Sequence, residues 1–83
     1  MAHVMELKEA VQHFQQYMTN KNIANKLGIS QGQLMKYANG TTKSCSDKVV
    51  DNFYDYFTLD GQPILLDYFP DVATYVSTRK LRQ

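Results

Sequence analysis

The chain lacks the features that mark secreted and membrane proteins. It contains one cysteine, Cys45, so it cannot form an internal disulfide, and a reducing compartment is its natural setting. Its longest wholly apolar run is three residues, Ile64–Leu66, which is too short to span a bilayer. The opening segment has no basic stretch followed by an apolar block, so we expect no signal peptide. These absences predict a cytoplasmic protein that makes no membrane contact.

Patterns that carry catalysis or bind metals are also missing. We find no pair of carboxylates at catalytic spacing, no phosphate-cradling glycine loop and no nucleophile elbow. His3 and His13 are far apart and have no cluster of further ligands, so we interpret them as solvent-facing side chains. Cys45 has no obvious catalytic partner, and the nearby Lys43 and Lys48 favour a thiolate only modestly. The sequence predicts a protein that is not an enzyme and uses no metal or cofactor.

The net charge of +1 is low for a protein that binds nucleic acid, but the charges are unevenly distributed. Residues 1–43 contain five lysines and two glutamates, a balance of +3. Residues 44–78 contain six aspartates and one lysine, a balance of −5, and the last residues add three basic side chains. Because phosphate binding depends on local charge, the first segment can still lie on DNA. The acidic segment would keep the opposite face of the protein away from it.

The length and the hydrophobic spacing predict one mainly α domain over residues 1–83. With 43% hydrophobic residues, the chain has room for a single core. Apolar side chains three and four residues apart, such as Leu7, Val11 and Phe14, are typical of an amphipathic helix. Asp60-Gly61 between apolar flanks predicts a hairpin, and Pro63 would confine its second arm to a sheet edge. We predict a compact helix-turn-helix bundle of four to five helices, at about 4–18, 20–27, 31–38, 46–57 and 70–79, with a short C-terminal β-hairpin whose arms are about 56–59 and 63–67.

Residues 19–40 carry the most informative pattern, because they match a helix-turn-helix at several positions in one register. Ala24 is small, as a residue must be where one helix crosses closely over another. Gly28 can supply the positive φ of a tight turn, and Ser30 stands where a second helix needs an N-cap oxygen. The further matches are interior and stop positions: Ile29, Leu34, Tyr37 and Asn39-Gly40. An ordinary helical hairpin is the alternative interpretation.

This stretch and the residues up to 57 resemble the phage Cro and repressor family of helix-turn-helix proteins. The matching residues are Ala24, Leu27-Gly28, Ser30-Gln31, Leu34, Asn39-Gly40 and Thr42-Lys43. In that family the second helix lies in the major groove of DNA, and polar residues at its start read bases. The resemblance implies DNA base contacts from Gln31, Gly32, Gln33 and Lys36. It implies DNA phosphate contacts from Thr19, Asn20, Lys21, Asn22, Thr42 and Lys43.

The C-terminal part follows no helix of that family. We therefore predict a DNA-binding core at about residues 4–57 and a dimerisation or interaction segment at about 58–83. Seven of the ten aromatic residues fall within 53–75, and a domain of this size has limited interior to cover them. They form either a dimer or partner interface or an aromatic core beneath the C-terminal half. The interface candidates are Phe53, Tyr54, Tyr56, Tyr68, Phe69 and Tyr75.

Two charged segments of this half also lead to expectations. Asp47, Asp51 and Asp55 recur every fourth residue and would form an acidic stripe on the fourth helix. We interpret the stripe as a solvated face, with contact to a basic protein as the alternative. Pro70 suits the first turn of the last helix, whose basic end we expect to fray. The side chains that this helix would bury are Val72, Tyr75 and Val76.

The leading hypothesis is a sequence-specific double-stranded DNA-binding transcriptional regulator that acts as a homodimer. Two copies would read a pseudo-palindromic operator with half-sites about one helical turn apart, and would block or recruit polymerase. The alternative is a helix-turn-helix scaffold whose acidic, aromatic C-terminal half binds a host protein. The low net charge and Gly32, where the family often has a side chain, favour the alternative. Gln31, Gln33 and Lys36 favour DNA binding.

Overall fold

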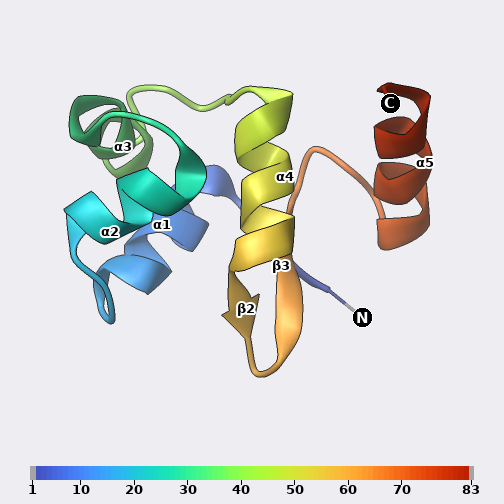
Figure 1. The fold of residues 1–83 in the computed structure, drawn as a ribbon, viewed down its shortest axis with the longest axis horizontal. Coiled ribbons are helices and arrows are strands. Elements are labelled where there is room, and N and C mark those ends of the chain that lie inside the picture. The colour runs from blue at the N-terminus through green and yellow to red at the C-terminus, as the bar shows by residue number, and fades with distance from the viewer. Residues whose placement is uncertain (1, 83) are drawn as a thin grey trace.

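A computed structural model describes residues 2–82 and confirms the mainly α fold (Figure 1). Over this range the chain forms five helices and three strands. In chain order they are β1 (His3–Met5), α1 (Leu7–Gln15), α2 (Asn20–Leu27), α3 (Gln31–Ala38), α4 (Asp47–Tyr56), β2 (Thr58–Leu59), β3 (Gln62–Leu66) and α5 (Val72–Arg82). The bounds predicted for α2 and α3 are confirmed. None of the helices within residues 2–82 has the length and apolar character needed to cross a membrane.

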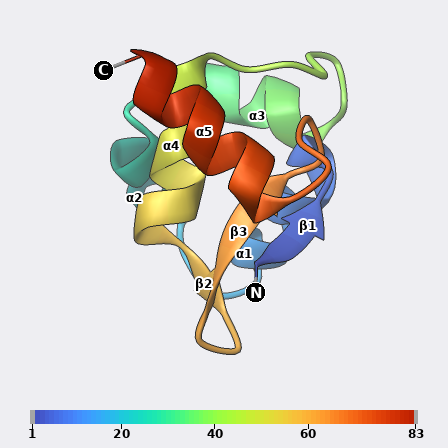
Figure 2. The ribbon, with the colours of Figure 1, turned by 90° about the vertical axis from the view of Figure 1, so that its right-hand side faces the viewer.

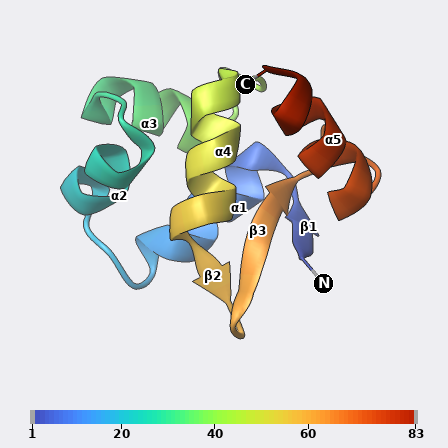
Figure 3. The same cartoon turned by 45° about the vertical axis from the view of Figure 1, so that its right-hand side comes forward.

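Helix α4 stands at the centre of the molecule and separates two groups of elements. Helices α1, α2 and α3 gather on one side of α4, and α5 lies on the other side (Figure 1). After a quarter turn, α5 crosses in front of α4, with the β2–β3 hairpin below both and β1 to the right (Figure 2). An intermediate view shows the same arrangement, with α2 and α3 turned away from α5 (Figure 3). The α2–α3 unit and α5 therefore occupy opposite faces.

The first helix was predicted over residues 4–18, and this prediction is wrong at both ends. Helix α1 covers Leu7–Gln15, and residues His3–Met5 instead form β1, which pairs in parallel with β3. Val4 lies opposite Leu65 and is 53% exposed, so it does not belong to the apolar stripe of α1. The N–H of Asp67 donates to the Met5 carbonyl at 3.0 Å and extends the pairing. These residues form a strand because their backbone groups pair with β3, which lies near the other end of the chain.

The predicted hairpin is present, but its second arm is not an edge strand. Asp60 and Gly61 have φ values of 54° and 77°, as a two-residue type I′ loop requires. Strand β3 lies between β1 and β2, so Pro63 belongs to the central strand. Pro63 is opposite Thr58, one pair beyond the Leu59–Gln62 pair next to the loop. Alternate pairs of an antiparallel ladder are not hydrogen-bonded, so the missing proline N–H costs no bond to β2.

The hydrophobic core lies between α1, α4 and β3. Ile64, Leu65 and Leu66 are consecutive and all fully buried. Successive strand residues point to opposite faces, so both faces of β3 are covered. Ala24, Leu34 and Tyr37 of the helix-turn-helix are buried as predicted, and Ile29 is half-buried against the same core.

Helix α5 is more firmly attached than its sequence indicated. It begins after Asp71, whose side-chain Oδ1 accepts a hydrogen bond from the Thr74 N–H at 2.7 Å. It continues to Arg82, so the expected fraying of its basic end is wrong. Tyr75 is fully buried, whereas Val72 and Val76 are only half-buried. The basic end is ordered because it meets opposite charges on α4.

The acidic stripe of α4 is paired with that basic end and is not a purely solvated face. Both terminal nitrogens of Arg79 contact the Asp55 carboxylate, at 2.8 and 2.6 Å. Both terminal nitrogens of Arg82 contact Asp51 at 3.2 Å, and its Nε lies 3.7 Å from Asp47. The four-residue spacing predicts that the three carboxylates share one face of α4. It does not reveal their partners, because these belong to α5, a helix later in the chain.

Candidate nucleic-acid interface

The turn between α2 and α3 contains the left-handed glycine that the sequence predicts. Gly28 has a φ of 72°, and the N–H of Ile29 donates to the Ala24 carbonyl at 3.0 Å. Helix α4 holds this end of α2, because the Asn52 side-chain amide donates to the Leu27 carbonyl at 3.0 Å. A carbonyl at a helix end has no partner within its own helix, so this bond satisfies an otherwise open acceptor. Asn52 thus ties the turn to the central helix, and the sequence analysis had not identified this contact.

Both helices of the unit begin at a hydroxyl cap. Thr19 Oγ1 accepts a hydrogen bond from the Asn22 N–H at 3.2 Å, and Ser30 Oγ accepts one from the Gln33 N–H at 3.1 Å. The far end of α3 is held by α1, whose Gln12 side-chain amide donates to the last carbonyl of α3 at 2.8 Å. Helix α4 therefore restrains the turn of the α2–α3 unit, and α1 restrains the end of α3. A recognition element needs such support from rigid neighbours.

One face of α3 is exposed and carries three of the four predicted base-contact residues. Gln31, Gly32 and Lys36 all lie on it. Met35, which the sequence analysis did not single out, is 44% exposed on the same helix. Glutamine and lysine side chains can hydrogen-bond to base edges in the major groove, so this face has suitable chemistry for reading DNA.

Gln33 does not share that exposure. It is half-buried, and its side chain interacts with the hydroxyl of Tyr37. Burial raises the pKa of Tyr37 and the nearby Cys45 adds to this effect, while the Gln33 side chain acts in the opposite direction. The structure therefore brings Gln31, Gly32 and Lys36 together on the surface and turns Gln33 towards the protein.

Gly32 is not required by the internal packing of the protein. A Cβ built at this position has the Ser30 Oγ as its nearest neighbour, at 3.9 Å, which is an ordinary contact. Glycine inside a helix costs about 1 kcal/mol relative to alanine. The residue therefore weakens α3 without relieving any contact inside the protein. It leaves space on the outer surface, where a ligand could approach the backbone closely.

The first group of predicted phosphate contacts lies at the start of α2: Thr19, Asn20, Lys21 and Asn22. Lys21 and Asn22 are exposed. The Asn20 side chain is instead used within the protein on both sides. Its Oδ1 accepts a hydrogen bond from Gln15 Nε2 at 3.1 Å, and its Nδ2 donates to Met35 Sδ at 3.4 Å. The Asn20 side chain therefore links α1, α2 and α3, and its contact with a phosphate stays a prediction.

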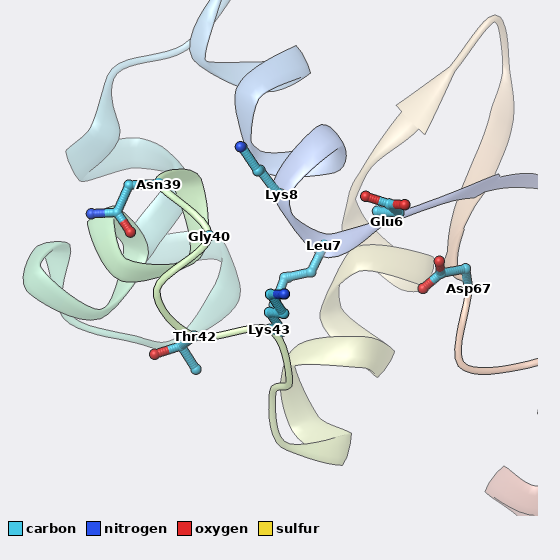
Figure 4. A pocket seen from close by; sticks show the side chains of 8 residues that line it. All are labelled: Glu6, Leu7, Lys8, Asn39, Gly40, Thr42, Lys43 and Asp67. Carbon is cyan, nitrogen blue, oxygen red and sulfur yellow. The ribbon is translucent and has the colours of Figure 1, made fainter.

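The second group lies in the loop after α3, beside a hollow of about 500 Å³ that the first turn of α1 completes (Figure 4). Lys43 is exposed here, and Thr42 is half-buried with its N–H donated to the Lys36 carbonyl at 3.2 Å. The structure adds Lys8, whose Cδ lies 3.4 Å from the position of a Cβ on Gly40. Lys8 belongs to α1, and spacing within one helix cannot show that its side chain reaches this loop.

The two carboxylates of the hollow stand apart from its lysine-bearing side. In Figure 4, Glu6 and Asp67 lie at the end opposite the α3–α4 loop, and the Lys8 side chain points away from them. Gly40 has a φ of 79°, which lets the loop turn sharply beneath the Lys8 stem. Lys8 and Lys43 therefore both border the surface next to α3.

Charge is segregated between the two faces of the molecule. No aspartate or glutamate occurs between Glu9 and Asp47, a stretch that includes α2, α3 and four lysines. Among residues 2–82, every ion pair involves Arg79 or Arg82 on α5. The lysines around α2 and α3 are therefore not neutralised by carboxylates of the described chain, whereas the acidic stripe is.

Four of the six aromatic interface candidates belong to a core instead. Phe53 and Tyr75 are fully buried, so their assignment to a surface is wrong. Tyr54 and Phe69 are half-buried and pack on Tyr75, with ring centroids 4.8 and 5.2 Å from its centroid. These four side chains therefore form the aromatic core beneath the C-terminal half that was the second interpretation of the sequence. The count of aromatics was misleading because α5 folds back over α4 and creates additional interior.

The other two candidates, Tyr56 and Tyr68, are 61% and 41% exposed. Tyr56 ends α4, whereas the Tyr68 hydroxyl donates to the Lys43 carbonyl at 2.9 Å, near the beginning of α4. The ten residues of α4 span about 15 Å. These two tyrosines therefore lie at opposite ends of α4 and do not form one patch.

The two histidines are less exposed than the sequence predicted, and the environment of the cysteine disfavours a thiolate. His3 and His13 are half-buried, and the His13 ring packs edge-on against Phe14 with centroids 5.0 Å apart. Burial raises the pKa of the Cys45 thiol above its usual value, and a hydrogen bond with Tyr68 only partly opposes this. The lysines near Cys45 in the sequence therefore do not make it a thiolate at neutral pH. Within residues 2–82 no three His, Cys, Asp or Glu side chains are grouped in a way that could hold a metal ion.

The site that the structure assembles is thus a capped helix-turn-helix with an acid-free outer face and lysines at both ends. Comparison of the chain with protein-family models, curated proteins and solved structures finds no match.

Proposed function

We propose that this protein is a sequence-specific double-stranded DNA-binding transcriptional regulator, similar in kind to the phage Cro and repressor family. The exposed face of α3 carries the proposal. Gln31, Gly32 and Lys36 lie on the outer face of this helix. Ser30 caps the start of α3, and Gln12 of α1 binds the carbonyl at its end. Glutamine can donate and accept at a base edge, and lysine can donate to guanine or to phosphate.

In this proposal α3 enters the major groove with its first turn towards the bases. Lys21 at the start of α2 and Lys43 after α3 lie at either end of the unit and contact the DNA backbone. Lys8 joins Lys43 on the same flank. The paired acidic stripe lies with α5 on the far side of α4, away from the phosphates (Figure 1).

A single domain of this size makes few phosphate contacts, so we propose that it acts as a homodimer on a pseudo-palindromic site. Tyr56 and Tyr17 are the exposed aromatics that border one shallow hollow of about 350 Å³. Tyrosine is enriched at protein interfaces. Sedimentation at micromolar concentration is expected to show a dimer. Tyr56→Asp, or Tyr68→Asp if the interface lies at the other end of α4, is expected to disrupt it. A monomer at every concentration would contradict dimerisation.

The central experiment is a selection of random duplexes on the purified protein at physiological salt, followed by gel shift of the enriched sequence. Gln31→Ala is expected to weaken binding to the enriched duplex by about 1–3 kcal/mol and to relax preference at one or two positions. Lys43→Ala is expected to weaken binding to all duplexes similarly. Lys80→Ala, on α5, is the matched control and is expected to bind like the parent protein.

Two outcomes would contradict the proposal. If the selection enriches no sequence, the protein is not a sequence-specific DNA-binding protein. If Gln31→Ala and Lys43→Ala lose affinity equally for every duplex, direct readout by Gln31 is wrong. The host-protein alternative keeps the exposed Tyr56 and Tyr68 as contacts, but the acidic stripe that would attract a basic partner is already paired with Arg79 and Arg82.

A further inference from the structure

Met35 is an apolar side chain on an otherwise polar surface. It is 44% exposed, and within residues 2–82 no other large hydrophobic residue of α2 or α3 is exposed to this degree. Gln31 and Gly32 precede it by one helical turn, and Lys36 follows it. A single exposed hydrophobic residue is ordinary on a protein surface, so its exposure alone assigns no role.

A chain of hydrogen bonds holds the Met35 thioether. Asn20 Nδ2 donates to Met35 Sδ at 3.4 Å, and Asn20 Oδ1 accepts from Gln15 Nε2 at 3.1 Å. The chain runs from α1 through α2 to α3, so two neighbouring helices restrain a side chain that is otherwise very flexible. A methionine that merely projected into solvent would not be restrained in this way.

The surface next to Met35 is open. A side chain on a helix leans towards the N-terminus of that helix, so Met35 leans towards the turn that contains Gln31 and Gly32. Gly32 has no side chain to cover it, and a Cβ there would meet only Ser30 Oγ, at 3.9 Å. Met35 and the bare backbone of Gly32 are therefore one helical turn apart on the exposed face of α3.

We propose that Met35 reads a thymine by packing against its C5-methyl group, an inference that rests on the DNA binding by α3 proposed above. In the major groove this methyl group is the apolar feature that distinguishes a thymine from the other bases. Gln31 and Lys36 supply polar contacts to neighbouring base pairs. Because Gly32 has no side chain, the backbone of α3 can come close enough to the groove for Met35 to touch the methyl group. The recognition face then combines polar readout with one methyl contact.

The test uses the duplex enriched by the wild-type protein, with each thymine replaced in turn by deoxyuridine. This change removes only the methyl group and keeps the base pair. For the wild-type protein we expect one position in each half-site at which deoxyuridine raises the dissociation constant about fourfold. This increase corresponds to the loss of one buried methyl group, about 0.8 kcal/mol. Met35→Ala is expected to bind the thymine and deoxyuridine duplexes equally. Met35→Leu, which stays apolar, is expected to retain discrimination.

The remaining outcomes separate this inference from the function on which it rests. If no duplex is enriched, sequence-specific binding fails and the methyl contact fails with it. If a duplex is enriched but deoxyuridine changes nothing at any position, only the methyl contact is overturned. It is also overturned if Met35→Ala keeps the full deoxyuridine effect. Circular dichroism of the exposed-site variants confirms that each is folded before binding is measured.

Discussion

At the residue scale, Gly28 and Gly32 are glycines for different reasons. Gly28 has a φ of 72°, in the left-handed region where a β-branched side chain is strained. Space alone does not exclude a side chain there, because a Cβ would lie 3.4 Å from Cε of the flexible Lys48. Gly32 lies within helical backbone and faces open space. Backbone conformation therefore restricts position 28, and nothing inside the protein restricts position 32.

The first prediction concerns the turn. Gly28→Val is expected to lower the free energy of unfolding by more than about 1 kcal/mol, because valine resists positive φ. Gly28→Asn is the matched control and is expected to lose less, since asparagine tolerates the left-handed region. Urea denaturation followed by circular dichroism measures both. A valine variant as stable as the parent would contradict the left-handed turn.

The second prediction concerns α3. Gly32→Ala is expected to raise the free energy of unfolding by up to about 1 kcal/mol, because alanine is the better helix former and adds no clash. Affinity for the enriched duplex is expected to fall, since the added methyl group keeps the backbone from the groove. Thermal melts and gel shifts on one preparation measure the two effects. Higher stability with unchanged affinity would show that DNA does not approach Gly32 closely.

At the element scale, α5 is attached to α4 by a buried tyrosine and two arginines. Tyr75 is fully buried, and its hydroxyl donates to Asp51 Oδ1 at 2.6 Å. Arg82 contacts the same carboxylate with two nitrogens, and Arg79 contacts Asp55 in the same two-pronged geometry. Exposed ion pairs contribute little individually, but bidentate geometry and a shared tyrosine make this group a network.

The third prediction is the pH dependence of this attachment. Burial raises the pKa of Asp51, but hydrogen bonds from Arg82 and Tyr75 and the charges of Arg82 and Arg79 outweigh it and hold the pKa below its usual value. A carboxyl group with a lowered folded-state pKa stabilises the protein above its ordinary pKa of about 4, and this stabilisation is lost as the pH falls through the folded-state value.

Asp51→Asn is therefore expected to be less stable than the parent protein at pH 7, with a difference that shrinks as the pH falls below about 4. Asp60→Asn, in the exposed hairpin loop, is the control, because asparagine suits a type I′ turn. Its difference from the parent at pH 7 is expected to be smaller than that of Asp51→Asn. Denaturation at several pH values measures both, and a gap that does not depend on pH would show that Asp51 is not stabilised by its arginines.

At the scale of the whole molecule, a net charge of +1 conceals two faces of different character. The α2–α3 side carries lysines without carboxylate partners in the described chain, and the α4–α5 side carries aspartates that arginines neutralise. The arginines of α5 cancel much of the acidic charge that would otherwise repel DNA. This arrangement supports phosphate binding by a nearly neutral protein.

The fourth prediction follows from this charge arrangement. Lys8→Ala is expected to lower the magnitude of the slope of log affinity against log salt by about one unit, because one phosphate contact is lost. Sequence preference is expected to remain, since Lys8 lies beside the loop after α3 and not on its exposed face. Titrations at several salt concentrations test this, with Lys80→Ala as the control. An unchanged slope for Lys8→Ala would exclude that lysine from the interface.

Much of the candidate site could be predicted because its signals are local. A glycine at a left-handed turn, a serine three residues before a free N–H and apolar residues at helical spacing all act within a few positions. Gly28, Ser30, Leu34 and Tyr37 are accordingly where the sequence predicted them. The contacts that were missed, such as those of Lys8 and Asn52, join residues on different helices, which single-helix spacing cannot reveal.

Short-range sterics and capping specify the two helices around Gly28, the exposed positions of Gln31, Gly32 and Lys36, and the hairpin, so local sequence is enough to predict them. Local sequence does not reveal the strand at His3–Met5, the central place of Pro63 in the sheet or the covering of the acidic stripe by α5. Each of these depends on partners distant in the chain, and backbone pairing or opposite charge selects such partners only when the fold brings them together.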